Sequence, residues 1–436
     1  MFEQEITALA NAIRGAVTKH KAENSVPMTR HVRIRKRDFT LMYQEDFAFA
    51  NFPAERTEED IWDLDDQMHF VDSVLVNLQE HKALVSALET DPKHAFPTDR
   101  FVRYVAFASS KGLTDARLQE IVKAFGHELD GLPISVGLTA FIAGLSIVES
   151  PLVISDSLTL RRPVPEDVAQ YVTLDESGGF SFPKSETWFR VVGQLIFNVA
   201  NTGVAQKKLL RTIGALRLFR VGAVAANRYS MEAQDSFLGP GVAVFGNPGL
   251  PGQRFYTLST SDAASLKVFL HDIAPLTPDP FQPAAPAATE KEIAYMRYNE
   301  ALFQDPPERA ITSAVTALEA LFLTNEPELR HRLAQRVSVF LRALGSHTDA
   351  PKTYDTVSKG YGIRSTFIHG GSLRPKDRPQ ADQLAPVLLE YARASVLAFL
   401  QIVTSKARLL TQLDRAMIDP AAVTELDGSL TPVVHK

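Results

Sequence analysis

The chain contains no cysteine. This absence excludes disulfide bonds, thiolate nucleophiles, zinc sites built on cysteine and iron–sulfur clusters. No stretch approaches the uninterrupted run of about 20 apolar residues that a membrane helix needs. The start, Met1-Phe2-Glu3-Gln4-Glu5, also lacks the basic and apolar regions of a signal peptide. We therefore expect a cytoplasmic protein without membrane association.

An excess of positive charge is lacking as well. The formal net charge is -5, and the apolar and charged fractions, 45% and 22%, are ordinary for a soluble globular protein. This balance excludes indiscriminate nucleic-acid binding through a general positive coat, so any such binding must use a local patch. The sequence has no His-Glu-x-x-His motif and no carboxylate cluster suited to a metal, and we expect no cofactor.

Proline, by contrast, is concentrated in one segment. Residues 274–289 contain five prolines, which exclude a helix or a central strand and indicate a semi-rigid linker. The predicted fold class is α+β, with a mixed domain over residues 1–273 that is a candidate for sensing or recognition. After the linker we expect an antiparallel helical bundle over residues 290–410 and a loosely ordered tail over residues 411–436.

The N-terminal part mixes helical and strand patterns. Apolar periodicity predicts a first helix through Ile6, Leu9, Ile13 and Val17, further helices over residues 116–125 and 207–218, and β-structure over residues 138–162 and 188–199. Residues 32–37 alternate as in a strand, and the basic positions are Arg33, Arg35 and Arg37. This basic ribbon could follow a phosphate backbone. We favour the alternative of an exposed strand whose charges discourage sheet aggregation, offset by the acidic residues between Glu58 and Asp66.

The C-terminal part has the clearest helical pattern. It predicts helices over residues 290–304, 308–323 and 328–344, a fourth that carries Tyr361 and ends at His369, and a fifth over residues 381–410. Glu319 lies at the edge of the apolar stripe of the second helix, so its carboxylate needs a partner. Arg336 on the third helix and Arg364 on the fourth are the two candidates.

Arg364 and His369 are separated by four residues and are followed by a predicted helix cap at Gly370-Gly371. Arginine is a permanent cation whose fork of donors fits a phosphate, and histidine moves protons near neutral pH. The pair suits cleavage of a phosphodiester without a metal. The structural alternative is an arginine that neutralises a buried acid and a histidine favoured by the helix dipole. An ideal helix sets the two residues about 140° apart, so they share a cleft only if another element closes over them.

Three segments in this order resemble a HEPN domain of the ApeA-like kind: residues 317–322, residues 328–337 and residues 361–371. The resemblance covers roughly residues 290–410, and a weaker likeness involves residues 158–167 and 216–219. It implies a bundle that dimerises so that two Arg-x4-His motifs face a common cleft.

Many members of this family are metal-independent endoribonucleases, often toxins or effectors of prokaryotic antiviral and abortive-infection systems. By this resemblance Arg364 and His369 are the active pair, RNA is the substrate, and the N-terminal domain responds to a phage-derived or cellular trigger. We expect Glu319 and Arg336 to be the ion pair that positions Arg364, with Tyr361 one turn away.

Ser365 follows Arg364 where many active members carry Asn, Asp or His. Serine can donate or accept a hydrogen bond but cannot buffer charge. Some HEPN domains bind RNA or a partner without cutting it, and in those the Arg and His are structural. Catalytic RNA cleavage and a non-catalytic module for RNA binding or assembly therefore both remain open.

Overall fold

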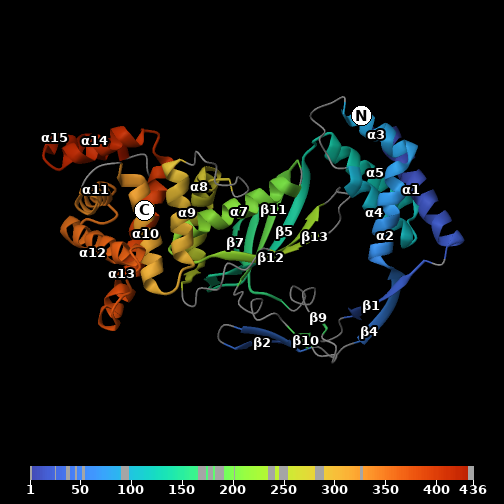
Figure 1. Cartoon of the computed structure of the whole chain (residues 1–436), viewed down its shortest axis with the longest axis horizontal. Helices are drawn as coiled ribbons and strands as arrows, with labels where there is room; N and C mark the ends of the chain where they lie inside the picture. Colours follow the sequence, from blue (N-terminus) through green and yellow to red (C-terminus); the bar gives the residue numbers. More distant parts are fainter. Residues whose placement is uncertain are drawn as a thin grey trace.

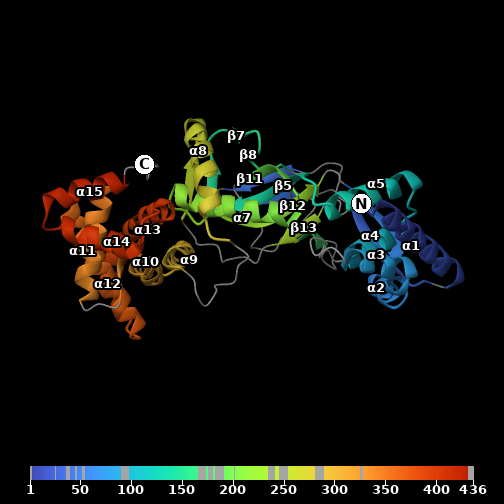
Figure 2. The ribbon, with the colours of Figure 1, turned by 90° about the horizontal axis from the view of Figure 1, so that it is seen from above.

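The computed structural model describes residues 2–24, 26–35, 40–44, 47–51, 55–89, 98–164, 173–174, 180–181, 191–200, 202–233, 241–244, 254–279, 289–324 and 328–430. Along its long axis the chain forms an N-terminal helical body, a central sheet and a C-terminal helical bundle (Figure 1), and the view from above has the same order (Figure 2). The fold class is α+β, as the sequence predicts.

Five helices build the N-terminal body around a core of their own. They are α1 (Glu3–Glu23), α2 (Leu64–Ser73), α3 (Gln79–Glu89), α4 (Thr98–Ser110) and α5 (Asp115–Leu129). The apolar positions predicted for the first helix are all fully buried, which confirms its amphipathic reading. Phe101 of α4 stacks on Phe125 of α5 with ring centroids 4.2 Å apart, so these two helices share the centre of the body.

The predicted basic strand is present and has an acidic neighbour. β1 (Met28–Arg35) pairs antiparallel with β4 (Glu55–Trp62), and β2 (Thr40–Gln44) pairs with β3 (Phe47–Asn51). The register places Arg35 opposite Glu55 and Arg33 opposite Thr57. Arg37 lies outside the described residues. The acidic stretch thus supplies the strand that pairs with the basic one.

An antiparallel six-stranded sheet forms the centre of the molecule, in the order β13-β12-β5-β11-β8-β7. Its strands are β5 (Ile134–Ala143), β7 (Leu152–Ser155), β8 (Leu158–Arg161), β11 (Val191–Val199), β12 (Ala225–Ala233) and β13 (Gly241–Val244). Two short pairs accompany it: β6 (Leu145–Ile147) with β14 (Tyr256–Leu258), and β9 (Thr173–Leu174) with β10 (Phe180–Ser181). The two predicted β-regions, residues 138–162 and 188–199, are confirmed at the residues that the structure describes.

In the described part of the chain, α7 (Thr202–Phe219) and α8 (Ala263–Ile273) pack against this sheet. α7 buries Leu209, Ile213 and Leu216 in one cluster with the strands, as its predicted periodicity requires, and α8 adds Leu266 to the same cluster. The region predicted as one mixed domain therefore contains two separate hydrophobic cores, one mainly of helices with Trp62 of β4 and one of sheet and helices.

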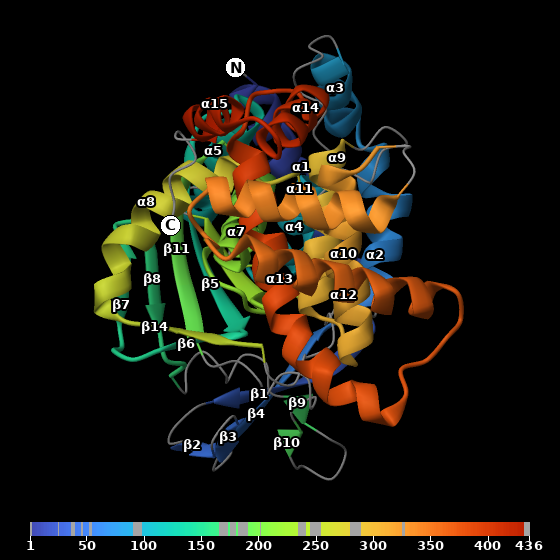
Figure 3. The same cartoon turned by 90° about the vertical axis from the view of Figure 1, so that its left-hand side faces the viewer.

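The C-terminal bundle closely follows the predicted helices. It contains α9 (Glu290–Leu302), α10 (Pro307–Phe322), α11 (Leu329–Ala343), α12 (Ala350–Ile368), α13 (Arg378–Gln401), α14 (Lys406–Ala416) and α15 (Pro420–Leu430). The end-on view shows α10, α11, α12 and α13 lying across one another (Figure 3). The predicted fifth helix is too long, because α13 ends at Gln401 and α14 begins a new direction after Ser405.

The prediction of a loosely ordered tail is wrong for residues 411–430. These residues belong to α14 and α15, and Leu413, Ala422, Leu426 and Leu430 are buried in the bundle core. The apolar residues of α15 recur every four positions, so its helix has one apolar face to bury. Residues 431–436 lie outside the described part of the chain.

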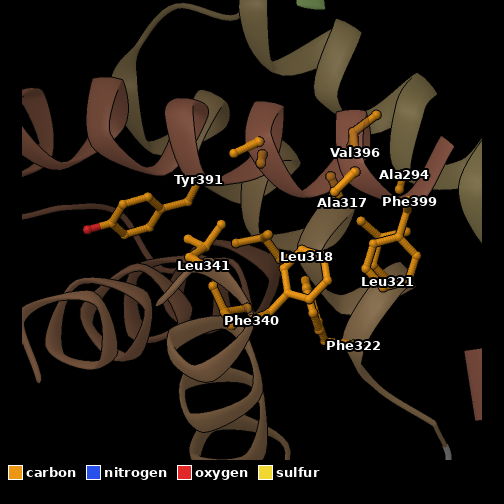
Figure 4. Packing of buried hydrophobic residues seen from close by; sticks show 14 of the residues in the cluster. Ala294, Ala317, Leu318, Leu321, Phe322, Phe340, Leu341, Tyr391, Val396 and Phe399 are labelled. Carbon is orange, nitrogen blue, oxygen red and sulfur yellow. The ribbon is translucent and has the colours of Figure 1, made fainter. Parts of the chain in front are cut away.

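Three phenylalanines form the centre of the bundle. The ring of Phe322 lies edge-on to Phe340 and to Phe399, with centroids 5.1 Å and 5.2 Å away (Figure 4). This edge-to-face arrangement is a favoured one for aromatic rings. α10, α11 and α13 each supply one of the rings, which fixes the three helices against one another.

The core of the bundle continues across the predicted linker. Ala215 and Leu218 of α7, with Phe269 and Ile273 of α8, belong to the same buried cluster as the bundle helices. In the linker itself, Ala274–Leu276 forms a short 3-10 turn, and residues 280–288 lie outside the described part.

One segment of the described chain, Pro375–Gln401, is long and apolar enough to cross a membrane. Of its apolar stretch, 61% is buried inside the structure. A mostly buried core helix passes the same test of length and composition, so one such segment is weak evidence for a membrane span.

Candidate functional site

The C-terminal end of α12 is built as a capped helix terminus. Gly370 has φ +79° and donates its N–H to the carbonyl of Phe367, while the N–H of Gly371 reaches the carbonyl of Thr366 at 2.9 Å. This pair of bonds is the Schellman motif, which satisfies the last helical carbonyls and needs a left-handed residue directly after the cap. The predicted Gly370-Gly371 cap is confirmed, and it places His369 at the last position before the chain turns away.

Arg364 is tied to α10. Its Nη2 lies 2.9 Å from Oε2 of Glu319, with the two side chains 24% and 14% exposed. Its guanidinium carbon lies 5.8 Å from the centroid of the Tyr361 ring. The Nε of Arg364 is buried and has no hydrogen-bond partner among the described residues. The arginine is thus anchored at one nitrogen while part of its donor fork remains available.

The position of Glu319 disfavours the ionised form of its carboxyl. Burial raises the pKa of this carboxyl above its ordinary value, and the charge and hydrogen bond of Arg364 lower it in part. This contact fits the alternative in which Arg364 has a structural role and neutralises a buried acid, because the arginine stabilises the ionised form of a largely buried carboxyl.

His369 is exposed on the surface of the bundle. Its backbone N–H donates to the carbonyl of Ser365 at 3.2 Å, which continues the helix by one bond. No hydrogen bond or ion pair links its ring to another side chain in the described part of the chain. The ring is therefore available to a ligand or to a second copy of the chain. The hydroxyl of Ser365 likewise has no hydrogen bond to a described residue.

Arg336 does not take the predicted place beside Glu319. It is 1% exposed, and its Nε and Nη2 each lie 2.8 Å from one carboxylate oxygen of Asp414 in a two-pronged ion pair. Its Nη1 donates to the carbonyl of Phe322, the last residue of α10. The expectation that Arg336 helps to position Arg364 is wrong, because Arg336 instead joins α14 to the end of α10.

An open groove of about 830 Å³ reaches the site from the side of α11. Its lining comprises Glu328, Leu329, Arg330, His331, Tyr354, Ser358 and Tyr361. Two contacts fix its wall: the ring Nδ1 of His331 lies 2.9 Å from the Tyr354 hydroxyl, and Arg330 donates to the hydroxyl of Ser358. Tyr361 belongs both to this groove and to the surroundings of Arg364.

Sequence reasoning missed Arg330, His331 and Tyr354. Two signals were present in the sequence. Tyr354 and Tyr361 are seven residues apart, which places them two turns apart on one face of α12, and Arg330, His331 and Arg332 form a basic run at the start of α11.

The remaining predicted residues lie elsewhere. Arg33 and Arg35 belong to β1, which lies at the opposite end of the molecule from α12 (Figure 1). The structure therefore groups Arg364, Glu319, Tyr361, Ser365 and His369 at one helix end and separates them from the basic strand. Among the described residues no group of three His, Asp or Glu side chains is placed to hold a metal ion.

The chain has no match among protein-family models, curated proteins or solved structures. Any function assigned to this site consequently rests on its own chemistry and on the resemblance of its motif.

Proposed function

We propose that the C-terminal bundle is a HEPN-type domain and that the protein is a metal-independent endoribonuclease of the cytoplasm, acting as an effector in a prokaryotic antiviral, abortive-infection or toxin-like stress system. The observation that carries the proposal is the end of α12, where Arg364 is held by Glu319 and an exposed His369 follows at the helix cap. In this proposal the N-terminal part receives a phage-derived or cellular trigger.

The two side chains have complementary roles in this reaction. His369 takes the proton from the ribose 2′-hydroxyl as its oxygen attacks the phosphorus, or gives a proton to the leaving 5′-oxygen. Arg364 stabilises the charge that gathers on the phosphoryl oxygens, and its link to Glu319 fixes its direction before the substrate arrives. The groove lined by Tyr354 and Tyr361 offers aromatic rings on which unpaired bases can stack.

A second copy of the chain would complete the cleft. Within one chain the two motif residues differ in placement, because Arg364 is held against α10 whereas His369 is exposed. Ile368, directly before His369, is 51% exposed, and an exposed branched apolar side chain at this position suits a contact with a partner bundle.

This contact predicts that Ile368→Glu weakens self-association. A carboxylate at the centre of a self-complementary contact meets its own copy, and the like charges repel. Light scattering coupled to size-exclusion chromatography should give the mass of a dimer for the wild type and of a monomer for the variant. Val153→Glu is the matched control, because Val153 is 59% exposed on the central sheet. Equal masses for the wild type and Ile368→Glu would contradict dimerisation through this surface.

Cleavage is tested with the purified full chain and mixed RNA in the presence of EDTA. We expect cleavage to persist without free divalent metal and to fall by roughly a hundredfold or more in His369→Ala, the loss typical for a general acid or base. His69→Ala is the control, because His69 is exposed on α2 in the N-terminal body. Equal cleavage by wild type and His369→Ala would overturn the assignment.

An effector can lack activity in vitro when its trigger is absent. The growth of cells that overexpress the protein is therefore measured as a second test. Toxicity of the wild type that disappears with Arg364→Ala supports the enzyme.

The second candidate is a non-catalytic module for RNA binding or assembly. The specific observation in its favour is the ion pair between Arg364 and Glu319, which gives the arginine a structural role. This candidate predicts that RNA is retained intact, and that replacing Arg33, Arg35 and Arg37 with Glu abolishes retention while the circular dichroism spectrum is unchanged.

A further inference from the structure

The central part of the chain contains a cavity that the proposed ribonuclease site does not use. Its volume is about 570 Å³, and its lining includes residues of α7, α8 and strands β7, β8 and β11. This volume falls within the usual range of pockets that hold small organic ligands, roughly 300–1,000 Å³. It is separate from the end of α12, which belongs to the bundle.

The inner wall of this cavity is apolar. Strand residues Ile154, Leu158, Leu195 and Phe197 meet Leu270 of α8 and the Ala274-Pro275 turn that follows it. Such a surface takes up the flat or apolar part of a ligand and removes it from water. Hydroxyl groups of Ser155, Ser157 and Thr212 add hydrogen-bonding positions to the lining.

Three permanent cations line the same cavity: Lys208 and Arg211 of α7 and Lys267 of α8. Among the described residues the lining includes no Asp or Glu, and none of the three cations forms an ion pair with a described residue. The neighbouring Lys207 behaves differently, since it is paired with Asp279. The three cations of the cavity therefore have no counter-charge among the described residues, and they give an anion in the cavity a positive surrounding.

Arg211 and Lys208 differ in burial, because Lys208 is exposed and Arg211 is partly buried. The Nε of Arg211 is buried and has no hydrogen-bond partner among the described residues. A buried donor of this kind is costly to leave unpaired. Lys208 is exposed, and its ammonium lies 5.5 Å from the centroid of the Phe197 ring. The lining thus combines two exposed ammonium groups, one buried guanidinium nitrogen and an aromatic ring.

We propose that this cavity is a binding site for a nucleoside phosphate. The base lies on the apolar wall beside Phe197, the hydroxyls of Ser155, Ser157 and Thr212 contact base or sugar, and the phosphates lie between Lys208, Arg211 and Lys267. Three cations distinguish this ligand from a fatty acid or another monocarboxylate, because one carboxylate neutralises one charge and leaves two uncompensated. A di- or triphosphate matches the charge of these three cations.

The test uses the full chain and four probes, ATP, GTP, CTP and UTP, with EDTA present because the described lining residues include no carboxylate for a metal. Isothermal titration calorimetry should detect at least one of them with a Kd below about 1 mM. If ATP binds, adenosine and inorganic triphosphate should each bind more weakly than ATP, because each lacks one part of the ligand. If another nucleotide binds, its own nucleoside replaces adenosine in this comparison.

Variants locate the site. The double variant Lys208→Gln with Lys267→Gln removes two charges of the lining at exposed positions, where folding is little affected, and we expect roughly a tenfold or larger loss of affinity. Lys207→Gln is the matched control on the same helix, since Lys207 is outside the lining, and it should bind as the wild type does. Arg211→Gln should also lose affinity, with circular dichroism to verify its fold.

Three results would overturn the proposal. One is the absence of binding by all four nucleotides, and another is equal binding by the double variant and Lys207→Gln. The third is binding of decanoate in place of any nucleotide, which would make the cavity a carboxylate site. None of these results bears on RNA cleavage at His369, so failure here is distinguishable from failure of the ribonuclease.

Discussion

Two arginines in the bundle show how environment separates a structural side chain from an available one. Arg336 is almost fully buried and directs its nitrogens at Asp414 and at the carbonyl of Phe322. Arg364 is partly exposed, and Glu319 is its one ion-pair partner in the described part of the chain. Because a guanidinium carries five donors, Arg364 can bind a further anion. The capacity to contact a phosphate therefore belongs to Arg364.

Removing the partner of Arg336 should destabilise the protein. In Asp414→Ala a buried guanidinium loses its counter-charge and two hydrogen bonds, and we expect the free energy of unfolding to fall by roughly 2–3 kcal/mol. This is below the usual loss for a fully buried pair because Asp414 is 40% exposed. Urea denaturation measures the change. Asp72→Ala, which removes an exposed partner of Arg103, should change stability by less than about 1 kcal/mol. Equal effects of both variants would contradict the buried role.

Glu319 should give the stability a pH dependence of known sign. Because its folded-state pKa is raised above 4.5, the folded protein binds this proton more readily than the unfolded chain does. Its contribution to stability is therefore largest below that value and is lost as the pH rises through the raised pKa. Subtracting the stability of Glu319→Gln from that of the wild type, both measured by thermal unfolding, should leave a difference that declines from pH 4.5 upward. A difference that rises with pH would show a lowered pKa instead.

The pairing of Glu319 illustrates what sequence can and cannot specify at this scale. Its position on the edge of an apolar stripe predicts a buried acid that needs a cation, and the structure supplies one of the two candidates. The partner of Arg336 could not be predicted, because Asp414 lies 78 positions further along and beyond the bundle that the pattern defined. Helical periodicity tells which side chains turn inward but not which distant element they meet.

At the scale of the element, α12 combines two glycines with opposite requirements. A Cβ added at Gly360 would lie 2.6 Å from Cδ1 of Leu388 and 3.3 Å from Cγ2 of Val315, whereas at Gly362 nothing lies within 4 Å. α12 thus approaches α10 and α13 closely through Gly360, and this approach sets the position of the helix that carries Arg364.

Alanine at the two positions should therefore act in opposite directions. Gly362→Ala should stabilise the protein by roughly 0.5–1 kcal/mol, because alanine has the higher helix propensity and meets no atom. Gly360→Ala should destabilise it by about 1–3 kcal/mol through overpacking against Leu388. Urea denaturation of both variants gives the comparison, and stabilisation by Gly360→Ala would mean that α12 does not pack as closely as described.

The helices were predictable where their signals are local and not where they depend on packing. Pro306-Pro307 and the Gly370-Gly371 pair mark the start of α10 and the end of α12, and both are found there. The end of α13 carries no glycine or proline that would mark it in the sequence. Ile402 and Val403, both β-branched, follow it, and Ser405 directly precedes α14. α15 contains Thr424, Asp427, Gly428 and Ser429, which lower its helix propensity, and the burial of Leu426 and Leu430 stabilises it.

At the scale of the whole molecule, the central helices and the bundle are joined by side chains that bind helix ends. Arg393 of α13 donates to the carbonyl of Leu218 at 2.7 Å, and Tyr298 of α9 donates to that of Arg217 at the same distance. Arg254 binds the carbonyls of Ala301 and Leu302 at the end of α9. These contacts give hydrogen bonds to carbonyls at the ends of α7 and α9, so the bundle and the central part of the chain complete each other.

This junction predicts that the bundle does not fold well when cut out at the linker, although the sequence marks residue 289 as a boundary. A fragment of residues 289–430 loses Leu218, Phe269 and Ile273 from its core, and each such side chain stabilises the fold by roughly 1.5–3 kcal/mol when buried. That loss is comparable with the whole stability of a typical domain. A fragment of residues 2–131 keeps α1 to α5 and a core that shares no member with the others, so it should fold alone. Urea unfolding followed by circular dichroism should give a cooperative transition for residues 2–131 and a broad, weak one for residues 289–430. A bundle fragment as stable as the full chain would mean that α7 and α8 only rest against it, whereas the expected result would make them part of the domain that carries Arg364 and His369.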